Sequence, residues 1–253
     1  MKVTFLGTGT SCGVPTIGCN CEVCTSKDPR DTRLRTSALV ETGRTRILID
    51  CGPDFRQQVL PLPFRRIDGI LLTHFHYDHV AGIDDVRPFS RFGDVDIYAD
   101  SHTSDSLRHN IPYCFAKEKY PGVPDLRLHT IEPHVEMAIG DIKIMPVRVM
   151  HGKLPILGYR FGSFAYITDM KTIEPQEMAY LAGVEVLAVN ALRFEKPHHS
   201  HQLVANAIEF ARKVGAKRTL FIHANHDMGL HATLQQRLPQ GFEMAYDGLV
   251  INV

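Results

Sequence analysis

Several features that would place a protein in a special class are missing from this sequence. There is no tryptophan among the 253 residues, and 28 basic residues balance 28 acidic ones to a formal net charge of +0. A neutral chain disfavours binding to long nucleic acid by counterion release. No apolar run approaches the roughly 20 residues that span a bilayer, and the N-terminus shows no signal-peptide pattern. We therefore expect a cytoplasmic protein that does not contact membranes.

Repeats, low-complexity tracts and linkers are also missing. The composition, 44% hydrophobic and 22% charged, is that of an ordinary globular protein with enough apolar residues for a substantial core. We therefore expect one domain over residues 1–253. The irregular segment from Val86 to Pro124 is expected to be an ordered excursion over the surface.

Short β-branched runs between turn signals recur along the chain and predict strands. Helical periodicity is clearest from Gln202 to Val214, with Gly215 as a stop signal, and weaker from Glu177 to Leu181. Strands with helices inserted between them predict an α/β protein of layered sheets flanked by helices. The predicted strands span residues 3–6, 37–42, 46–50, 69–73, 95–99, 142–147, 164–168, 184–189, 219–222 and 249–253.

Four potential metal ligands directly follow the predicted strand 69–73, namely His74, His76, Asp78 and His79. Side chains alternate along a strand, which places His74 and His76 on one face. If the chain then turns, Asp78 and His79 point to a second position, so the segment could serve two neighbouring ions. Imidazole and carboxylate together suit zinc, manganese or iron better than calcium or magnesium. A solvated histidine-rich loop is the alternative, although loops after buried strands commonly carry catalytic residues.

This cluster resembles the ligand motif of the metallo-β-lactamase superfamily of binuclear metallohydrolases. Gly7-Thr8-Gly9 after the first strand and Asp50-Cys51-Gly52 after an Ile-Leu-Ile strand add to the resemblance. It implies a four-layer αββα sandwich with two metal ions at the edge between its sheets. The implied ligand sets are His74, His76 and His151 for one ion and Asp78, His79 and His223 for the other, with Asp169 bridging them.

Such a ligand set implies hydrolytic chemistry. Two adjacent cations, zinc or manganese, lower the pKa of a bridging water enough to make hydroxide available near neutral pH. The resemblance also bears on redox chemistry, because the di-iron flavoproteins of this superfamily carry a glutamate at the position of His76. A histidine there argues against reduction of oxygen or nitric oxide.

A second cluster of potential ligands contains Cys19, Cys21 and Cys24. In a chain without a signal peptide this spacing favours a metal clip over a disulfide, although three reduced cysteines lining a turn is the alternative. The cluster resembles that of the PhnP-like phosphodiesterases of phosphonate metabolism. That resemblance implies a structural zinc with His226 as fourth ligand. The other cysteines, Cys12, Cys51 and Cys114, are expected to be small buried apolar residues.

His201 is a candidate catalytic residue because its distance from His223 resembles that of the PhnP-like acid histidine. A histidine can protonate the alkoxide that leaves a phosphodiester. The alternative is a helix cap or surface residue, and the neighbouring His198 and His199 make the choice ambiguous. Asp78 could share proton transfer, although a metal-bound carboxylate is a poor donor. We assign no site role to the arginines around Arg33, since charged runs are usually solvated loops.

The combined motifs favour a binuclear metal-dependent phosphodiesterase acting on a small phosphodiester, with a cyclic one such as a ribosyl cyclic phosphate as the expected substrate. A tRNA 3′-processing endonuclease is a rival, but it carries a long Gly- and Pro-rich arm that this sequence lacks. A thioester or lactone hydrolase would leave the cysteine cluster and His201 unexplained. A non-catalytic scaffold would be expected to lose ligands, and all seven are present. The sequence does not specify the leaving group, the choice between zinc and manganese, or whether the protein forms a homodimer.

Overall fold

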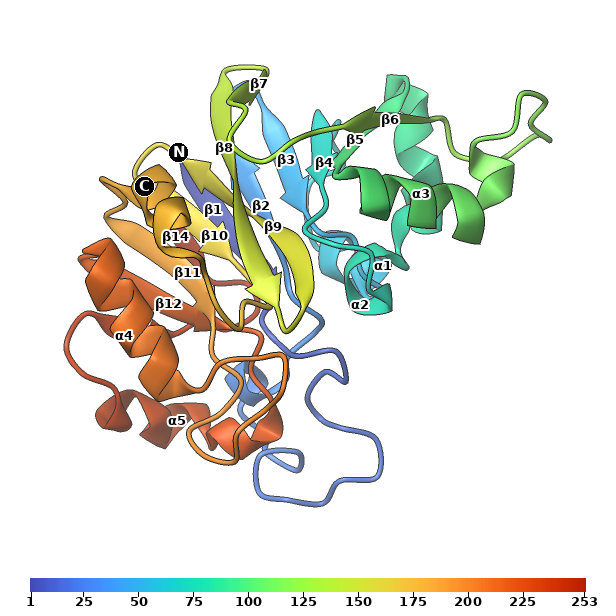
Figure 1. Cartoon of the computed structure of the whole chain (residues 1–253). Helices are drawn as coiled ribbons and strands as arrows, with labels where there is room; N and C mark the ends of the chain where they lie inside the picture. The colour runs from blue at the N-terminus through green and yellow to red at the C-terminus, as the bar shows by residue number, and fades with distance from the viewer.

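Two seven-stranded sheets form the centre of the protein, and helices cover their outer faces (Figure 1). The structure is a computed structural model that describes residues 1–253. The strand order is β14-β1-β2-β3-β4-β5-β6 in the first sheet and β13-β12-β11-β10-β9-β8-β7 in the second. This arrangement confirms the αββα sandwich that the sequence motifs imply.

The elements have the following bounds. The first sheet contains β1 (Lys2–Gly7), β2 (Ser37–Glu41), β3 (Arg46–Ile49), β4 (Gly69–Leu71), β5 (Val95–Ala99), β6 (Leu126–Thr130) and β14 (Val250–Asn252). The second contains β7 (Met137–Ile139), β8 (Ile142–His151), β9 (Leu154–Phe161), β10 (Phe164–Ile167), β11 (Val186–Asn190), β12 (Arg218–Ile222) and β13 (Phe242–Met244). The α-helices are α1 (Phe55–Val59), α2 (Tyr77–Val80), α3 (Ser101–Asn110), α4 (Val204–Val214) and α5 (His231–Leu234). The 3-10 helices are η1 (Pro29–Asp31), η2 (Ile83–Phe92), η3 (Pro112–Cys114), η4 (Pro175–Leu181), η5 (His226–Met228) and η6 (Gln235–Arg237).

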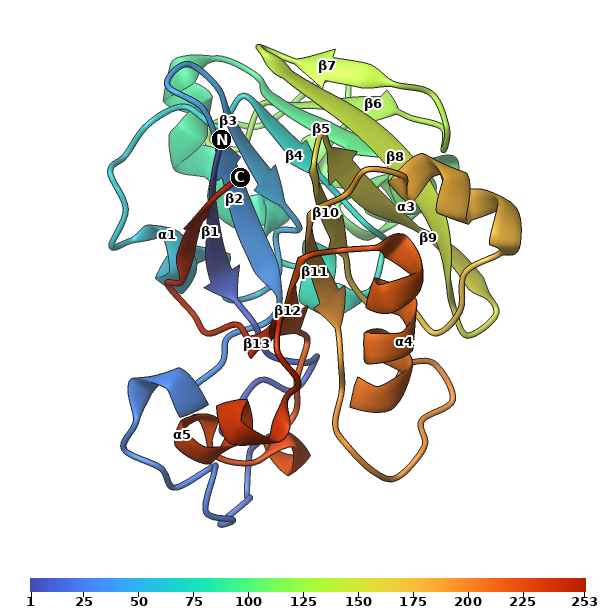
Figure 2. The same ribbon diagram turned by 90° about the vertical axis from the view of Figure 1, so that its left-hand side faces the viewer.

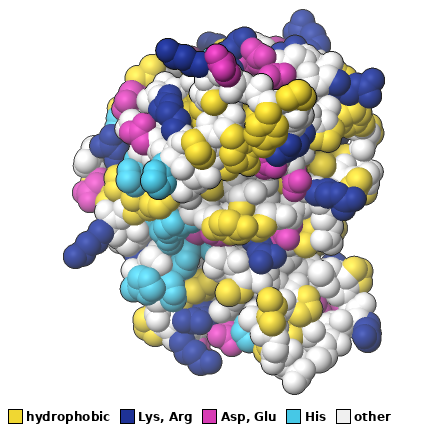
Figure 3. Space-filling view, turned by 90° about the vertical axis from the view of Figure 1, so that its right-hand side faces the viewer, with side chains coloured by type: hydrophobic (Ala, Val, Ile, Leu, Met, Phe, Trp, Pro, Cys, Tyr) yellow, Lys and Arg dark blue, Asp and Glu magenta, His cyan; other side chains and the backbone are white.

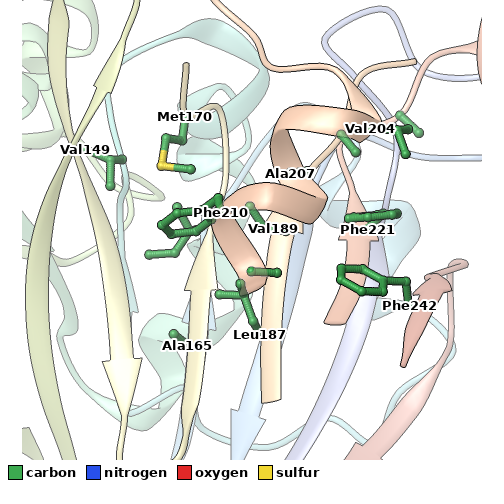
Figure 4. Packing of buried hydrophobic residues seen from close by; sticks show 14 of the residues in the cluster. Val149, Ala165, Met170, Leu187, Val189, Val204, Ala207, Phe210, Phe221 and Phe242 are labelled. Carbon is green, nitrogen blue, oxygen red and sulfur yellow. The ribbon is translucent and has the colours of Figure 1, made fainter. Parts of the chain in front are cut away.

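Three apolar layers hold the sandwich together. The middle layer lies between the sheets and contains fully buried Phe5 and Tyr159. One outer layer packs α1, η2 and α3 against the first sheet. The other packs α4 against the second sheet, where Ala207 and Phe210 face Leu187 of β11 (Figure 4). The central strands are therefore buried on both faces, which is why β4 and β10 are almost wholly apolar.

The two chain ends pair with each other at the edge of the first sheet. Strands β1 and β14 run antiparallel there, and Figure 2 shows both termini close together at their ends. The amino group of Met1 donates a hydrogen bond of 2.7 Å to the carbonyl of Val253. Residues from opposite ends of the chain therefore form one edge of the first sheet. No helix in this structure has the length and apolarity needed to cross a membrane.

The clearest helix prediction is confirmed, since α4 lies within residues 202–214 and ends at Gly215. This glycine has a φ of 81°, and its N–H donates to carbonyls of the last turn. Such a left-handed residue is a common end of an α-helix. Residues 177–181 form part of a 3-10 helix instead of an α-helix.

Each of the ten predicted strands overlaps an observed one, but β6, β7, β9 and β13 were not predicted. Strand β9 contains Pro155 and Gly158, which weaken a strand pattern. Strand β6 contains polar residues among its apolar ones, which weakens the apolar run. Strands β7 and β13 have only three residues each, too few to form a pattern. The expectation of a surface excursion from Val86 to Pro124 was wrong, because this segment contributes Val86 and Leu107 to the core beneath η2 and α3.

Candidate metal centre

The predicted ligands meet where strands of the two sheets end. His74 lies just beyond β4 of the first sheet, whereas His151 ends β8 and His223 follows β12 in the second. Asp169 follows β10, and Asp78 and His79 lie on the short helix α2. Asp169 and His223 have positive φ angles of 56° and 55°. Residues with side chains seldom adopt this conformation, and such strain clusters at functional sites.

His74, His76 and His151 form the first group that could hold a metal ion. The Nε2 atom of His74 is 3.0 Å from Nδ1 of His76. Burial holds the pKa of His74 well below its usual value and also lowers the pKa of His76. Neutral imidazole is the form that binds a metal, so no proton has to be displaced from these rings.

Asp78, His79 and His223 form the second group. Nε2 of His79 lies 3.2 Å from a carboxylate oxygen of Asp78, and Nε2 of His223 lies 3.7 Å from the same oxygen. Asp169 stands beside both rings, with one oxygen 3.2 Å from His79 Nε2 and the other 3.1 Å from His223 Nε2. Its two oxygens thus face the two rings separately, in a position from which one carboxylate could contact two ions.

Two observations indicate that metal ions fit this centre. The Nε2 atoms of His79 and His223 are buried and have no hydrogen-bond partner in the protein. Their separations from the neighbouring oxygens are close to the ~3.4 Å expected between two ligands of one tetrahedral ion at about 2.1 Å. Burial opposes ionisation, yet the neighbouring imidazoles hold the pKa of Asp78 and of Asp169 below its usual range. Both carboxylates are therefore ionised and available to a cation.

Asp50 orients His79 and was noted in the sequence only as part of a motif. It is fully buried, and its Oδ2 is 2.7 Å from Nδ1 of His79. The backbone N–H and hydroxyl of Thr73 donate to the same carboxylate at 2.8 to 3.1 Å. The carboxylate keeps a proton on Nδ1 and leaves Nε2 facing the centre, as partners of metal-binding histidines commonly do. The signal available in the sequence was an aspartate directly after the apolar run Ile47-Leu48-Ile49.

His201 lies inside the centre, whereas His199 is exposed. The Nδ1 atom of His201 is buried without a hydrogen-bond partner and lies 3.5 Å from Oδ1 of Asp169. Its ring stacks at 4.7 Å on that of His223. Burial and the neighbouring His223 lower the pKa of His201 to about 2. The helix-cap alternative is wrong, because the N-cap of α4 is Leu203.

Lys171 holds the loop that carries His201, a feature that no sequence motif indicated. Its ammonium group donates to the carbonyl of His198 at 2.6 Å and to that of His201 at 3.1 Å. Between these two residues, the carbonyl of Ser200 lies 3.1 Å from Nδ1 of the candidate ligand His151. The loop is thereby fixed next to the candidate ligands although it contains no helix or strand.

The structure also brings together Cys19, Cys21, Cys24 and His226. The sulfurs of Cys19 and Cys21 lie 3.2 and 3.3 Å from Nδ1 of His226. The contact with His226 lowers the pKa of Cys21 to about 6, whereas burial raises that of Cys24 to about 11. All these cysteines are free. The loop that carries them is blue in Figure 2 and lies next to α5, far along the chain.

Two expectations about neighbouring residues need correction. Cys12 is exposed, whereas Cys51 and Cys114 are buried as expected. Arg33 is not in a solvated loop but is 4% exposed. Its Nη1 donates to the hydroxyl of Thr8 at 2.8 Å and to the carbonyl of Ala245 at 2.6 Å. These contacts are possible because the Gly7-Thr8-Gly9 turn approaches the loop after β13, so Arg33 supports the turn next to the centre.

Histidines gather on one face of the molecule, where they form a continuous band at the surface (Figure 3). Within the centre, His76, His151 and His201 come from three separate segments of the chain. Rings of these segments lie within 5.1 Å of each other. The centre is therefore a product of the fold, and only His76 and Asp78 among the candidate ligands are partly exposed.

A family model described as the beta-lactamase superfamily domain matches residues 45–224. The solved structure of a diphosphatase of the PhnP family is 42% identical, with a TM-score of 0.91 over 99% of this chain and 96% of that one. An octanoyltransferase of Porphyromonas gingivalis is 43% identical over 98% of this chain, which covers 51% of that protein. A ribonuclease Z of Bradyrhizobium is 32% identical over 61% of this chain and 51% of its own length. The chain thus spans about half the length of these two curated relatives.

Proposed function

Because the chain belongs to the beta-lactamase superfamily of metal-dependent hydrolases, we propose that it is a binuclear phosphodiesterase for small substrates, cyclic phosphodiesters included. The observation that carries this proposal is the position of His201. Its ring lies against Asp169 and His223 in a centre that already has seven candidate ligands. A phosphodiester needs such an extra proton donor because its leaving alkoxide is a strong base.

Two divalent ions, zinc or manganese, would be held by the His74, His76 and His151 group and by the Asp78, His79 and His223 group, with Asp169 between them. When bound, such ions supply Lewis acidity and a water of lowered pKa. The protein orients the groups of this centre, Asp50 through His79 and Lys171 through the His201 loop.

His201 acts on the leaving group in this proposal. Its imidazole is neutral in the free protein because burial lowers its pKa. An anionic phosphodiester placed beside the ring favours the protonated form, so the proton is acquired in the complex with substrate. His201 then donates it to the departing oxygen. Asp78 is assigned to metal binding, since a carboxylate bound to metal is a poor proton donor.

The four-residue group of Cys19, Cys21, Cys24 and His226 is proposed to hold a structural zinc. Three thiolates and one imidazole complete a tetrahedral shell and leave no open position for a substrate. The site joins the N-terminal loop to the segment after β12. Because it needs reduced cysteines, it also supports a cytoplasmic location.

A second candidate activity is hydrolysis of a diphosphate bond. It is favoured by the 42% identity to a diphosphatase that extends over nearly the whole chain. The same ligands could cleave either bond, because the attacked atom is phosphorus in both and only the leaving group differs. A tRNA endonuclease is less favoured, since the ribonuclease Z relative matches 61% of the chain and the formal net charge is +0.

The test compares substrates that differ in their leaving group. Protein loaded with zinc or manganese is assayed on bis(p-nitrophenyl) phosphate, a 2′,3′-cyclic nucleotide and a thioester. We expect turnover of the phosphodiesters only. His201→Ala should lower the rate on the cyclic nucleotide by about 10²- to 10⁴-fold and much less on the aryl ester, because p-nitrophenolate needs little protonation.

The matched control is His199→Ala, since His199 is exposed two residues earlier in the same loop. It should retain the activity of the unmodified protein on both phosphodiesters. Turnover of the thioester without turnover of either phosphodiester would overturn the proposed function. Equal losses on both phosphodiesters in His201→Ala would remove His201 from the acid role.

A further inference from the structure

The proposed function leaves one inward-facing histidine of the His198–His201 loop without a role. His198 lines, together with His201, a small polar pocket of about 240 Å³. Its ring lies 5.0 Å from that of His201 and is tilted by 30° from it. His199 is exposed and does not line the pocket. Of the two neighbouring histidines, His198 is therefore the one placed to contact a ligand beside His201.

Contacts at both its backbone and its ring fix the position of His198. Its carbonyl accepts a hydrogen bond of 2.6 Å from the ammonium group of Lys171. Its Nδ1 atom accepts from the backbone N–H of Ser200 at 3.3 Å, and the hydroxyl of Ser200 lies 3.3 Å from the same atom. A side chain that is held in this way before a ligand arrives loses little conformational freedom on binding.

The contact with Ser200 also determines the tautomer of His198. A neutral imidazole carries one proton, so the nitrogen that accepts a hydrogen bond leaves the proton on the other nitrogen. A backbone N–H can only donate, and Nδ1 of His198 is therefore unprotonated. The proton is on Nε2. Both polar contacts of the ring are at Nδ1, so the Nε2–H is free to donate to a ligand.

The neutral form of His198 is the one that meets the substrate. Partial burial and the neighbouring His199 lower the pKa of His198 below its usual value. Protonation would also place a second proton on Nδ1, where the N–H of Ser200 would then face another donor. A donor that loses its acceptor costs free energy. His198 is therefore suited to donate a hydrogen bond while it keeps its proton.

The position of His201 indicates which substrate oxygen His198 reaches. If His201 protonates the leaving oxygen, the leaving group lies on the His201 side of the phosphorus, and both rings line the pocket on this side. We propose that His198 is a second residue in contact with the substrate, whose Nε2–H donates a hydrogen bond to the oxygen that leaves the phosphorus. This inference rests on the proposed function and adds a residue to its mechanism.

The two histidines have different tasks in this reaction. Water forms the new bond to phosphorus, and the bond from phosphorus to the leaving oxygen breaks. The proton lost by water is balanced by the proton that His201 gives to the leaving oxygen, whereas His198 retains its own. The hydrogen bond from His198 strengthens as negative charge develops on the leaving oxygen, so it stabilises the transition state more than the bound substrate. Its loss should therefore lower kcat and leave KM nearly unchanged.

Two substitutions of His198 separate hydrogen bonding from ring packing. His198→Gln keeps an N–H donor close to the position of Nε2 but has no ring, whereas His198→Phe keeps a ring beside His201 but has no donor. In the metal-loaded protein, His198→Phe should lower kcat on a 2′,3′-cyclic nucleotide by about 10²- to 10³-fold, and His198→Gln should retain at least about ten times the kcat of His198→Phe. On bis(p-nitrophenyl) phosphate the two variants should differ little, because p-nitrophenolate is stable as an anion.

His199→Phe is the matched control, since His199 is exposed in the same loop. It should leave turnover of both substrates unchanged. Equal losses in His198→Gln and His198→Phe, or a larger loss in His198→Gln, would overturn the donor role, because the ring itself would then be what matters. Full activity of His198→Phe on the cyclic nucleotide would overturn it as well.

Nitrogen NMR of the histidine rings separates this inference from the proposed function. The signals of His198, assigned by their loss in His198→Gln, should show the Nε2–H tautomer. Addition of inorganic phosphate to the zinc-loaded protein should shift the Nε2–H signal downfield. If neither phosphodiester turns over, the proposed function fails, and these signals still test the donor. A proton on Nδ1 instead, or a signal that phosphate leaves unchanged, would refute the role of His198.

Discussion

Replacement of Asp50 by asparagine tests whether a carboxylate that touches no metal position controls the metal centre. The change keeps the size and shape of the side chain. It also keeps the backbone conformation, because asparagine tolerates the positive φ of 57° at this position. What changes is the partner of His79, whose Nδ1 lies 2.7 Å from Oδ2 of Asp50.

The magnitude follows from the hydrogen bonds around Asp50. Oδ1 accepts from the N–H of Thr73 at 2.8 Å, so it must stay an oxygen in the variant. The amide NH₂ is then placed at Oδ2, where it faces Nδ1 of His79. That arrangement favours the tautomer with its proton on Nε2, the atom that faces the centre. Loss of such a partner costs about 10- to 100-fold in metal affinity, or about 1.4 to 2.7 kcal/mol.

The assay is competition between the protein and a chelator of known affinity, with zinc and with manganese. Asp50→Asn should lower the affinity for the ion near His79 by this factor. It should lower the affinity for the ion near His76 much less. Melting of the metal-free proteins shows whether the variant still folds. Asp141→Asn is the control, since Asp141 binds the hydroxyls of Thr42 and Thr45 far from the centre. Affinity equal to that of the unmodified protein at both ions would refute the tautomer argument.

Three further variants test other parts of the structure. Asp169→Ala should abolish hydrolysis and lower the metal content at both positions, because its two oxygens face His79 and His223 separately; elemental analysis that finds both ions retained would contradict a bridging role. Cys21→Ser should remove the structural zinc and lower the free energy of unfolding by about 4 kcal/mol when zinc is present at 1,000 times its dissociation constant. Unchanged zinc content and melting temperature would exclude that site. Lys171→Ala should lower turnover of a cyclic nucleotide by about 10²-fold, since a small displacement of His201 is costly, with little effect on the aryl ester. Lys171→Arg should restore activity. In the double variant with His201→Ala, Lys171→Ala should cause no further loss of turnover. Additive losses would show that Lys171 acts elsewhere.

Local patterns in the sequence determined much of the fold. Alternation and β-branched runs indicated ten strands, because a strand buried on both faces is apolar whatever it packs against. The helix ending at Gly215 was visible for a similar reason, since its periodicity and stop signal are local. Strand β9 was missed because its pairing with β8 along the whole strand compensates for Pro155 and Gly158, and no local pattern reveals a partner.

The sequence also indicated which residues could bind metal ions. The spacing of His74, His76, Asp78 and His79 is local, and the structure brings these residues together with the downstream candidates. Which histidine of the His198–His201 loop enters the centre was decided by the tertiary structure, through Lys171 and the carbonyl of Ser200.

Burial was the other property that only the tertiary structure decided. A charged residue in a loop is solvated by default, yet Arg33 is enclosed because the turn at Thr8 and the loop at Ala245 supply hydrogen-bond acceptors from opposite ends of the chain. The role of Asp50 arises in the same way, because it depends on Thr73 and His79, which the fold brings next to the end of β3.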